Sequence, residues 1–330
     1  MTIRRGVGLT PMETRREVIL DAAVLAEELG YETFAVPEGW GLDSTPLVTE
    51  IALRTNRIHL TSAVLSIWGR TPATLAMTAA TLHQVSGGRY ALGLGASTKA
   101  LAEGFHDTPF EHPAAKLREV VTQVRTLLSG EPAALRRAPQ AHSLRLNQTA
   151  APEVPLWIGA LGPQTTRVAA ELGDGWIPAL AARDGLASWA AALARVREHH
   201  DPGLARLTVA SGPIAVAAED PGLARDIAAA CAAWYLTAMG DVYARSVAEQ
   251  GYAEQVKEII AANPRPNPRR AMVPPSAQPV LDQLAVYGSS EQVRGDIKRW
   301  DDAVDIVSIL LPPGLPWPIM EATIRAAAPR

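Results

Sequence analysis

The sequence predicts an α/β fold: a (β/α)8 TIM barrel with a helical insertion after the seventh strand. Short apolar runs alternate along the chain with longer segments of helical periodicity, and eight such runs match the strand number of a closed parallel barrel. Residues 221–262 are strongly helical and too long for one crossover. The runner-up is an open doubly wound sheet, whose Gly-x-Gly-x-x-Gly motif finds only a weak match at Gly93–Thr98.

Each predicted strand is a short apolar run that ends near glycine, proline or polar residues. In chain order, the strands are expected at 6–9, 33–36, 58–65, 90–94, 156–159, 175–178, within 207–217, and at 304–310.

Helices are predicted between these strands, because apolar residues there recur every three or four positions. Gly30 ends the first helix, Asp43 and Ser44 are candidate caps of the second, and Pro72 begins the third at a favoured position. The helices are expected at 14–29, to about 54 after the caps, 72–85, 114–128, 164–172, 186–199, 290–300 and 318–326. Residues 130–153 are predicted to be an irregular excursion, and residues 263–280 a proline-rich loop.

Length and composition are consistent with one large domain. The chain has 330 residues and is 48% hydrophobic, enough for a sizeable core. We therefore interpret residues 1–330 as one barrel domain, with the insertion at about 221–280.

Charge and cysteine content exclude several partner classes. The net charge of −3 gives no electrostatic footprint for nucleic acid or an anionic membrane. No apolar run reaches the roughly 18 residues that span a bilayer, and the first residues lack the long apolar core of a signal peptide. With Cys231 as the single cysteine, we expect a cytoplasmic protein and an inert core thiol. The seven histidines show no metal-ligand spacing, so no metal is expected.

Two glycine-rich loops follow predicted strands. Gly93 and Gly95 lie where the fourth strand leaves the sheet, and the same strand, small loop and helix return at 156–165. Glycine lets a flat ligand or a phosphate approach the backbone. Two such loops on one chain indicate a cofactor that lies across several βα loops.

These and further motifs resemble the luciferase-like monooxygenase superfamily, most closely its coenzyme F420-dependent oxidoreductase branch. The matching stretches span nearly the whole chain in order: Ala26–Tyr31 with Val36–Glu38, Thr61–Pro72, Ala76–Leu82, Ser86–Ser97, Glu103–His106, Gly159–Pro163 with Gly173–Trp176, Trp234–Gly240 and Gly288–Val293. The resemblance implies a (β/α)8 barrel with an insertion after the seventh strand.

The resemblance also implies a cofactor position at the carboxyl-terminal mouth of the barrel. The ring of coenzyme F420, or alternatively of FMN, is expected against the end of the third strand, with a cis peptide bond at Ala63–Val64. The phosphate is expected at the turn 161–165, where free amides at a helix start attract an anion and Thr165 offers a hydroxyl. The full set of expected cofactor-binding residues is Ala63, Val64, Ser66, Gly95, Ala96, Ser97, Thr98, Gly159, Ala160, Leu161, Gly162, Pro163, Gln164 and Thr165.

The ring carries the hydride in this chemistry, so few side chains are needed for catalysis. Glu38 is the first candidate for moving a proton or contacting the substrate, and His106 is the second. The alternative for Glu38 is a buried hydrogen-bonding carboxylate that fixes the mouth of the barrel, and the alternative for His106 is a surface or structural loop residue. Trp40 and Trp68 are expected to wall an apolar substrate pocket, while Arg70 either meets an anionic cofactor tail or is solvated.

Three functions remain open at this point. The leading interpretation is an F420-dependent oxidoreductase that transfers a hydride between the deazaflavin and a small organic substrate. The alternatives are an FMN-dependent monooxygenase that uses reduced flavin and O2, and a catalytically inactive barrel that serves as a binding subunit. A homodimer is expected. Residues 263–280 are predicted to form either a mobile lid over the substrate or a passive surface linker.

Overall fold

The computed structural model describes residues 4–135, 138–268 and 270–329. Its strands are β1 Arg5–Leu9, β2 Thr33–Val36, β3 His59–Ser62, β4 Leu65–Ser66, β5 Tyr90–Gly95, β6 Leu156–Gly159, β7 Gly175–Ile177, β8 Thr208–Ser211, β9 Ile214–Ala217, β10 Ala285–Gly288 and β11 Ile306–Leu311.

The helices around these strands follow the predicted order. They are α1 Arg16–Glu28, α2 Ser44–Arg54, α3 Pro72–Val85, α4 Lys99–Gly104, α5 Pro113–Leu128, α6 Pro163–Leu172, α7 Arg183–His200, α8 Pro221–Ala238, α9 Asp241–Val247, α10 Ala253–Ala262, α11 Gln278–Leu284, α12 Ser290–Asp296 and α13 Trp317–Ala326. Three shorter helical turns join them: the π-helix η1 Ala248–Tyr252, and the 3-10 turns η2 Pro275–Ala277 and η3 Ile297–Trp300.

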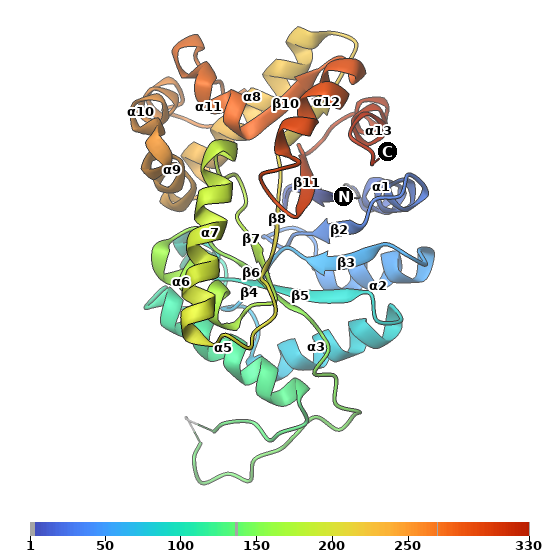
Figure 1. Ribbon diagram of the computed structural model, residues 1–330, viewed down its shortest axis with the longest axis vertical. Coiled ribbons are helices and arrows are strands. Elements are labelled where there is room, and N and C mark those ends of the chain that lie inside the picture. Colours follow the sequence, from blue (N-terminus) through green and yellow to red (C-terminus); the bar gives the residue numbers. More distant parts are fainter. Residues whose placement is uncertain (1–3, 136–137, 269, 330) are drawn as a thin grey trace.

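The parallel strands close into a barrel, which confirms the predicted fold class. The order β1-β2-β3-β5-β6-β7-β8-β11 returns to its start, because β11 pairs with β1 from Arg5↔Val307 to Leu9↔Leu311. Figure 1 shows helices α1, α2, α3, α5, α6 and α7 surrounding the strands, with the insertion at one end of the molecule. The excursion between α5 and β6 lies at the other end and contains no helix or strand within its described residues.

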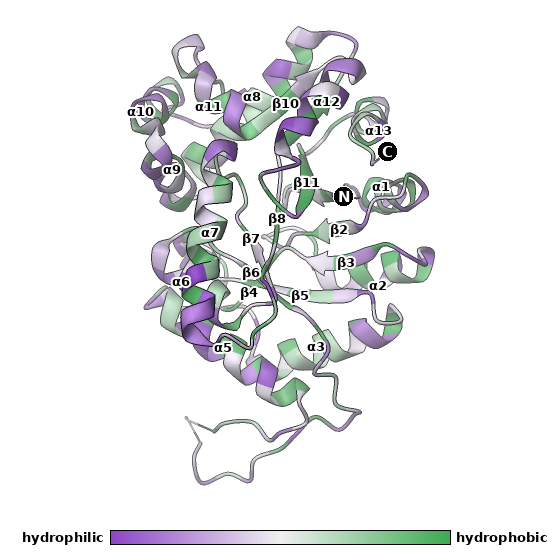
Figure 2. Cartoon of the chain, viewed as in Figure 1, coloured by the Kyte–Doolittle hydropathy of each residue, from purple (hydrophilic) through white to green (hydrophobic). Residues whose placement is uncertain are grey.

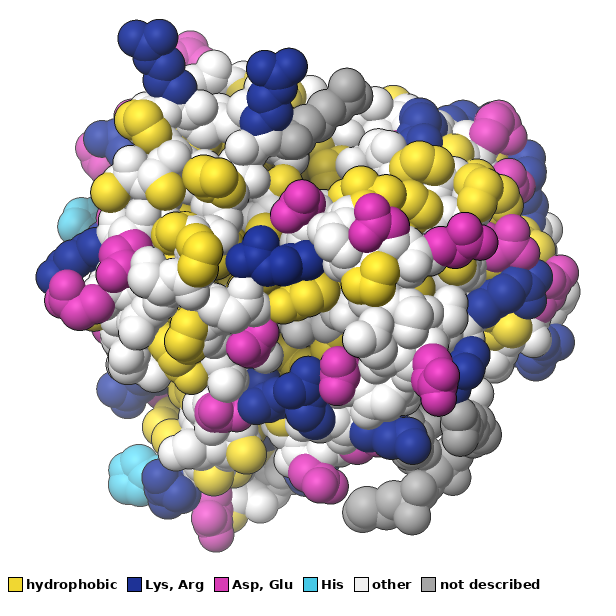
Figure 3. All heavy atoms as spheres, turned by 90° about the horizontal axis from the view of Figure 1, so that it is seen from above, with side chains coloured by type: hydrophobic (Ala, Val, Ile, Leu, Met, Phe, Trp, Pro, Cys, Tyr) yellow, Lys and Arg dark blue, Asp and Glu magenta, His cyan; other side chains and the backbone are white. Residues whose placement is uncertain are grey.

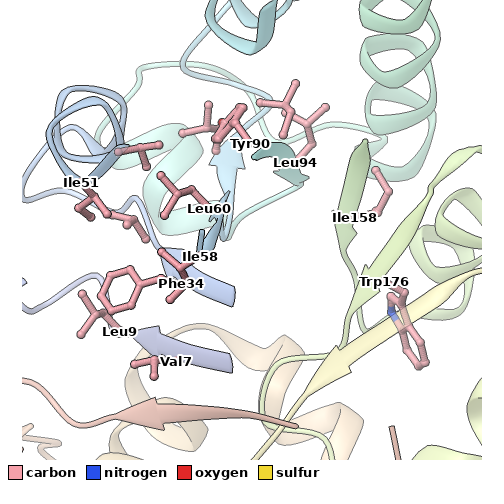
Figure 4. Close-up of a cluster of buried hydrophobic side chains, with 14 of the residues drawn as sticks. Val7, Leu9, Phe34, Ile51, Ile58, Leu60, Tyr90, Leu94, Ile158 and Trp176 are labelled. Atoms are coloured by element: carbon pink, nitrogen blue, oxygen red, sulfur yellow. The ribbon is translucent and has the colours of Figure 1, made fainter. Parts of the chain in front are cut away.

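The outer face of the barrel carries the large apolar side chains. Val7, Phe34, Leu60 and Leu92 are fully buried and belong to the main hydrophobic cluster, which also contains Ile51 of α2. Figure 4 shows Val7, Phe34, Leu60 and Ile51 among the side chains of this cluster. Burial of each such side chain contributes about 1.5–3 kcal/mol, so the contact between barrel and helices dominates the stability of this part of the fold.

The inner face of the barrel carries small and hydroxyl-bearing residues instead. Parallel partners share a face, so the printed register places one set of residues on the inside of successive strands. This set is Gly6, Thr33, Ala35, Thr61, Ala91, Gly93, Trp157, Gly175, Thr208 and Ser308. Apart from Trp157, these side chains are smaller than the bulky branched residues that usually fill the interior of such a barrel.

Two predicted strands are each divided in two. The third was expected to run without a break over 58–65, but it ends at Ser62 and resumes as β4, which pairs with Leu94 and Gly95 of β5. The seventh is interrupted at Gly212-Pro213, where proline has no amide to donate. Its first half, β8, pairs with β7 and β11, while its second half, β9, pairs with β11 and β10.

The insertion after the seventh strand is larger than the expected 221–280. It runs from α8 through β10 and includes a strand, Ala285–Gly288, that the sequence analysis missed. A second hydrophobic cluster fills it, with Ile214 and Val216 of β9 packed beside Ala228 and Leu236 of α8. Figure 1 shows α8, α9, α10 and α11 grouped with β10.

The proline-rich loop was predicted to cover 263–280 and is shorter in the structure. Residues 275–284 are helical, as η2 and α11. The amide of Asn263 closes the base of the remaining loop: Nδ2 donates to the Met272 carbonyl at 2.8 Å, and Oδ1 accepts from the Met272 amide at 2.9 Å. This double contact fixes both ends of the loop.

The surface shows no strong segregation of charge on the face seen in Figure 3, where basic and acidic side chains are interspersed. Figure 2 shows hydrophobic strands inside and polar bands on the outer sides of helices such as α5 and α7. Among the described residues, none of the helices is both long and apolar enough to cross a bilayer.

Candidate functional site

The carboxyl ends of the barrel strands form the mouth in which the predicted cofactor residues meet. Active sites of this fold lie at that end. The inward-facing residues near the mouth are partly exposed, unlike the outer core: Ala35 on β2, Val64 after β3, Gly159 on β6, Ile177 on β7 and Leu310 on β11. They give the mouth an apolar floor.

The segment between β3 and β4 crosses this floor. The Ala63–Val64 peptide bond is cis, which confirms the prediction for this bond. The Ala63 amide donates to the Val36 carbonyl of β2 at 2.9 Å, and Leu65 rejoins the sheet beside Leu94. The segment is therefore held by backbone contacts on both sides.

Glycines on the two neighbouring strands make room for this segment. A Cβ atom on Gly95 would lie 2.5 Å from Val64 Cγ2, and one on Gly159 would lie 2.8 Å from Val64 Cγ1. A Cβ on Gly93 would collide with the Ser62 carbonyl oxygen. At these three positions, any residue other than glycine would force the segment between β3 and β4 or its neighbours to move. Gly95 and Gly159 are also paired with each other across β5 and β6.

The loop after β5 is held by its neighbours. The Trp68 indole donates to the Ala96 carbonyl at 2.7 Å, and Ser97 has a left-handed backbone with φ of 57°. The Thr98 hydroxyl accepts from the Leu101 amide and caps α4, a helix that the sequence analysis did not predict. Ser66 is buried, and its hydroxyl accepts from the Trp68 amide at 3.2 Å.

The loop after β6 leads directly into α6. Gly162 is the N-cap residue without a side-chain cap, and Pro163 follows at the first helical position. The amides of Gln164 and Thr165 have no acceptor within the described chain, as the first amides of a helix normally lack one. The Thr165 hydroxyl donates to the Gly162 carbonyl at 3.0 Å.

The side chains of Ala160 and Leu161 in this loop are buried, so only their backbone is available to a ligand. A Cβ on Gly162 would meet just the Thr165 hydroxyl, at an ordinary 3.6 Å. The loop therefore offers two free amides at an open helix start, which is a favourable place for an anion.

Glu38 lies in an ion-pair network at the mouth. The Arg70 guanidinium pairs with it through both nitrogens, at 2.8 Å for Nη2–Oε2, and Nη2 also reaches Asp43 Oδ1 at 3.0 Å. Free solvation of Arg70 is wrong, because its guanidinium engages two carboxylates, while contact with an anionic cofactor tail stays a prediction. The hydrogen bond that Arg70 donates to Glu38 raises the pKa of the Arg70 guanidinium despite burial.

Asp43 has the capping role that its position predicted. It accepts from both the amide and the hydroxyl of Thr45 at 2.8 Å. Burial opposes ionisation of its carboxyl group, but the Thr45 hydrogen bonds and Arg70 lower its pKa overall. A charged Asp43 thus binds the same Arg70 guanidinium as Glu38.

The loop after β4 brings Glu38 and His106 to neighbouring positions. Arg70 binds Glu38, and the adjacent Gly69 packs on the His106 ring, where a Cβ would lie 2.7 Å from Cε1. The His106 ring meets Phe105 edge-on, with ring centroids 5.1 Å apart. The two predicted catalytic residues therefore flank one short loop.

Aromatic side chains form one wall beside this loop. Trp68 packs against Phe110, with ring centroids 5.5 Å apart, and Phe105 is 58% exposed. The sequence analysis named Trp68 but missed Phe105 and Phe110, which follow a helix that it did not predict. Trp40 is 45% exposed, and the described residues show no ring contact between Trp40 and Trp68.

The first part of the insertion touches the mouth. A Cβ on Gly240 would lie 3.4 Å from Thr98, and one on Gly185 at the start of α7 would lie 3.1 Å from Gln250 of η1. Met12, just after β1, packs against the cluster of the insertion. Gly240, in the segment 239–252, thus lies beside the cofactor loop that contains Thr98. The role of the proline-rich loop as a lid or a linker stays a prediction.

Cys231 is buried in α8, and burial raises the pKa of its thiol to about 12. It is therefore protonated and unreactive at neutral pH. Among the described residues, no three His, Cys, Asp or Glu side chains gather closely enough to hold a metal ion.

Known proteins resemble the chain in both sequence and fold. Residues 1–305 match the family model of the luciferase-like monooxygenases. A protein of Mycobacterium tuberculosis, whose name describes it as a coenzyme F420-dependent oxidoreductase, is 32% identical over 52% of each chain. The 5,10-methylenetetrahydromethanopterin reductase of Archaeoglobus fulgidus is 31% identical over 46% of each chain. The chain thus spans about half the length of the curated relatives it matches.

Solved structures show the same fold over the whole chain. The coenzyme F420-dependent tetrahydromethanopterin reductase of Methanopyrus kandleri aligns with a TM-score of 0.75 and 19% identity, over 99% of this chain and 98% of its own. The FMN complex of the oxygenating constituent of 3,6-diketocamphane monooxygenase from Pseudomonas putida aligns with a TM-score of 0.66 and 15% identity, over 99% and 98%. These identities speak for the shared barrel alone.

Proposed function

Because the chain belongs to the luciferase-like monooxygenase family, we propose that it is a coenzyme F420-dependent oxidoreductase that acts on a small organic substrate. One observation carries the proposal: the barrel mouth combines an apolar floor at Ala63–Val64 with two free amides at the start of α6. A flat ring and a phosphate need these two features. The name of the relative from Mycobacterium favours F420 over FMN.

The residues of the mouth fit such a cofactor. Gly95 and Gly159 carry no side chain that would displace Val64, and their loops lie side by side. Gln164 and Thr165 would bind the phosphate through their amides, and Thr98 and Ser97 lie on the neighbouring loop. When bound, F420 supplies the hydride carrier at its ring.

The residues of the chain must orient the substrate and handle one proton. Glu38 is held by Arg70, so we propose that it acts as a charged acceptor that fixes a donor group of the substrate. His106 borders the same loop and is our candidate for moving the proton. Trp68, Phe105 and Phe110 would exclude water from the apolar side of the substrate.

A binding titration tests the cofactor. Purified protein is titrated with F420 and, separately, with FMN, and the change in absorbance or fluorescence of each is followed. We expect tighter binding of F420. Tight binding of FMN with oxygen consumption by its reduced form would support the monooxygenase instead, and failure to bind either would support an inactive barrel.

We further propose that the protein is a cytoplasmic homodimer that uses the outer face of α3. This helix has no Asp, Glu, Lys or Arg, and it exposes Met77 (57%) and Val85 (38%). Leu53 of α2, which packs against α3, is also exposed. An uncharged, partly apolar helix face is typical of an interface. Sedimentation analysis should show a dimer that dissociates in Met77→Lys but not in Met272→Lys, which alters an exposed methionine in the proline-rich loop.

A further inference from the structure

The break in the third strand leaves part of β5 without a backbone partner on that side. β3 pairs with β5 up to Thr61, and β4 resumes the pairing from Leu65. Residues 62–64 therefore stand opposite residues 92–93, so the divided strand carries one residue more than its neighbour, as in a β-bulge. The backbone groups of β5 that face this gap are buried and need another partner.

The Ser62 hydroxyl supplies that partner. The Gly93 amide donates to Ser62 Oγ at 3.0 Å, and Ser62 Oγ donates to the Gly93 carbonyl at 3.2 Å. Ser62 is 1% exposed and every residue of β5 is buried, so water does not replace these contacts. A buried backbone group without a partner is unfavourable. One side chain thus takes the place of the backbone hydrogen bonds that a continuous strand would make with Gly93.

The Tyr90 hydroxyl fixes the orientation of Ser62. The two hydroxyl oxygens lie 2.9 Å apart, and Tyr90 is 1% exposed within the main hydrophobic cluster (Figure 4). Ser62 has one hydroxyl proton, which it donates to Gly93, so Tyr90 is the donor in this contact. Burial raises the pKa of Tyr90, so the phenol keeps the proton that it donates. The contacts from Tyr90 to Ser62 to Gly93 therefore have one consistent set of donors and acceptors.

Ser62 is directly followed by the Ala63–Val64 segment, which crosses the floor of the mouth. This segment is attached at three places: the Ala63 amide binds the backbone of β2, β4 rejoins β5, and Ser62 binds Gly93. The first two attachments use backbone atoms alone. Of the three, the Ser62 attachment is made by a side chain, so its loss would let the segment move while the floor itself keeps its side chains.

We propose that Ser62 and Tyr90 are positioning residues for the cofactor, which hold the Ala63–Val64 segment at the height where the ring rests. This inference rests on the proposed function, in which a flat ring lies against the segment. Both side chains are buried, so they act through the segment and not by touching the ring. The role depends on the shape of the floor, so it applies to F420 and FMN alike.

Two substitutions remove the hydroxyls and retain most of each side chain: Ser62→Ala and Tyr90→Phe. The chain offers a matched control for each. Ser86 is also buried, and its hydroxyl accepts from a backbone amide at 3.2 Å and donates to a carbonyl at 3.1 Å. The buried Tyr31 hydroxyl donates to a carbonyl of α13 at 2.6 Å. Both controls precede a barrel strand, so Ser86→Ala and Tyr31→Phe lose comparable hydrogen bonds at the end of the barrel opposite the mouth.

Hydrogen exchange at the Gly93 amide tests the attachment in the protein without cofactor. We expect exchange to be about tenfold faster in Ser62→Ala than in Ser86→Ala, because the Gly93 amide loses its acceptor. Equal exchange in these two variants would show that Ser62 does not hold the segment to β5, and would overturn the proposal.

Cofactor titration tests the positioning itself. F420 and FMN are titrated separately into each protein, and the absorbance and fluorescence of the bound ring are recorded. We expect Ser62→Ala and Tyr90→Phe to bind the cofactor that the wild type takes about fivefold more weakly or worse, with a ring spectrum closer to that of the free cofactor. Ser86→Ala and Tyr31→Phe should keep the wild-type affinity and spectrum. If Ser62→Ala does not fold, Tyr90→Phe against Tyr31→Phe decides.

The outcomes separate this inference from the proposed function. Wild-type affinity and an unchanged ring spectrum in Ser62→Ala and Tyr90→Phe would refute the positioning role alone. A wild-type protein that binds neither F420 nor FMN would refute the proposed function and, with it, the positioning role.

Discussion

Gly95→Ala tests whether the divided third strand depends on the glycines beside it. The new Cβ would lie 2.5 Å from Val64 Cγ2, whereas carbon atoms in good contact are about 3.5–4.0 Å apart. An overlap of this size must move Val64 or β5, and overpacking of this kind costs about 1–3 kcal/mol. Gly95 has no positive φ, so backbone strain does not contribute to the effect.

Removal of the colliding methyl groups should rescue the variant. Val64→Ala is expected to cost about 0.5–1.5 kcal/mol by itself, since it deletes two partly buried methyls. In the double variant the alanine at 95 has room, so its free energy of unfolding should lie near that of Val64→Ala alone. The interaction term of this cycle should then be at least about 1 kcal/mol.

Urea unfolding followed by circular dichroism measures all four proteins. Gly104→Ala is the control, because a Cβ there meets nothing within 4 Å and alanine favours the helix. If Gly95→Ala is as stable as Gly104→Ala, or if the two substitutions are additive, the proposed packing of Val64 between the glycines is incorrect.

Three further predictions concern the cofactor loop, one buried carboxylate and the proline-rich loop. Gly162→Val should weaken cofactor binding at least tenfold with little loss of stability. The valine Cβ has room, but the valine methyl groups cover the amides of Gln164 and Thr165. The control variant Gly295→Val, in the open part of α12, should bind the cofactor normally. Burial opposes ionisation of Glu27, but the amides of Ile58, Arg57 and Asn56 lower its pKa overall, so its stabilisation is present above the usual value of 4.5 and is lost as the pH falls. Glu27→Gln should therefore flatten the acid side of the stability profile, and an unchanged profile would contradict this role. Asn263→Ala should cost about 1–3 kcal/mol and loosen the proline-rich loop, because both hydrogen bonds between Asn263 and Met272 are lost. Unchanged substrate kinetics in this variant would support the passive linker, whereas a large change in KM would support the lid.

Periodicity predicted the barrel well because its strands and helices alternate with clear punctuation. Thr33–Val36, Leu156–Gly159 and Pro72–Val85 have the predicted bounds. Each is an apolar run or a helical repeat with a cap, glycine or proline at its end. These local signals predict the elements correctly because tertiary packing in the barrel favours the same secondary structure.

The missed elements lack such local signals. β10 is a four-residue run that pairs only with β9, so its existence depends on a partner some 70 positions earlier. The cis bond at Ala63–Val64 in the third strand was expected only through the family resemblance, since the sequence from Ser62 to Leu65 is typical of a continuous strand. The Gly212-Pro213 step did offer a signal for the division of the seventh strand, which periodicity alone overlooked.

In the candidate site, too, some features could be predicted from the sequence and others could not. Loops and their order along the barrel placed the cofactor residues, but side-chain partners across loops were beyond the sequence. Arg70 shows this most clearly, because its two carboxylates come from 32 and 27 positions away.

The division of the seventh strand has a consequence for engineering this chain. β8 belongs to the barrel wall, while β9, two residues later, is the spine of the insertion and carries its hydrophobic cluster. The insertion therefore cannot be removed by deleting its helices alone. Deletion of α8–α11 would expose the apolar side chains of β9 and leave a strand with an unpaired edge. A graft between relatives should exchange the unit from Gly212 to Gly288 as a whole, and its junctions should lie at the proline step and before the capped start of α12.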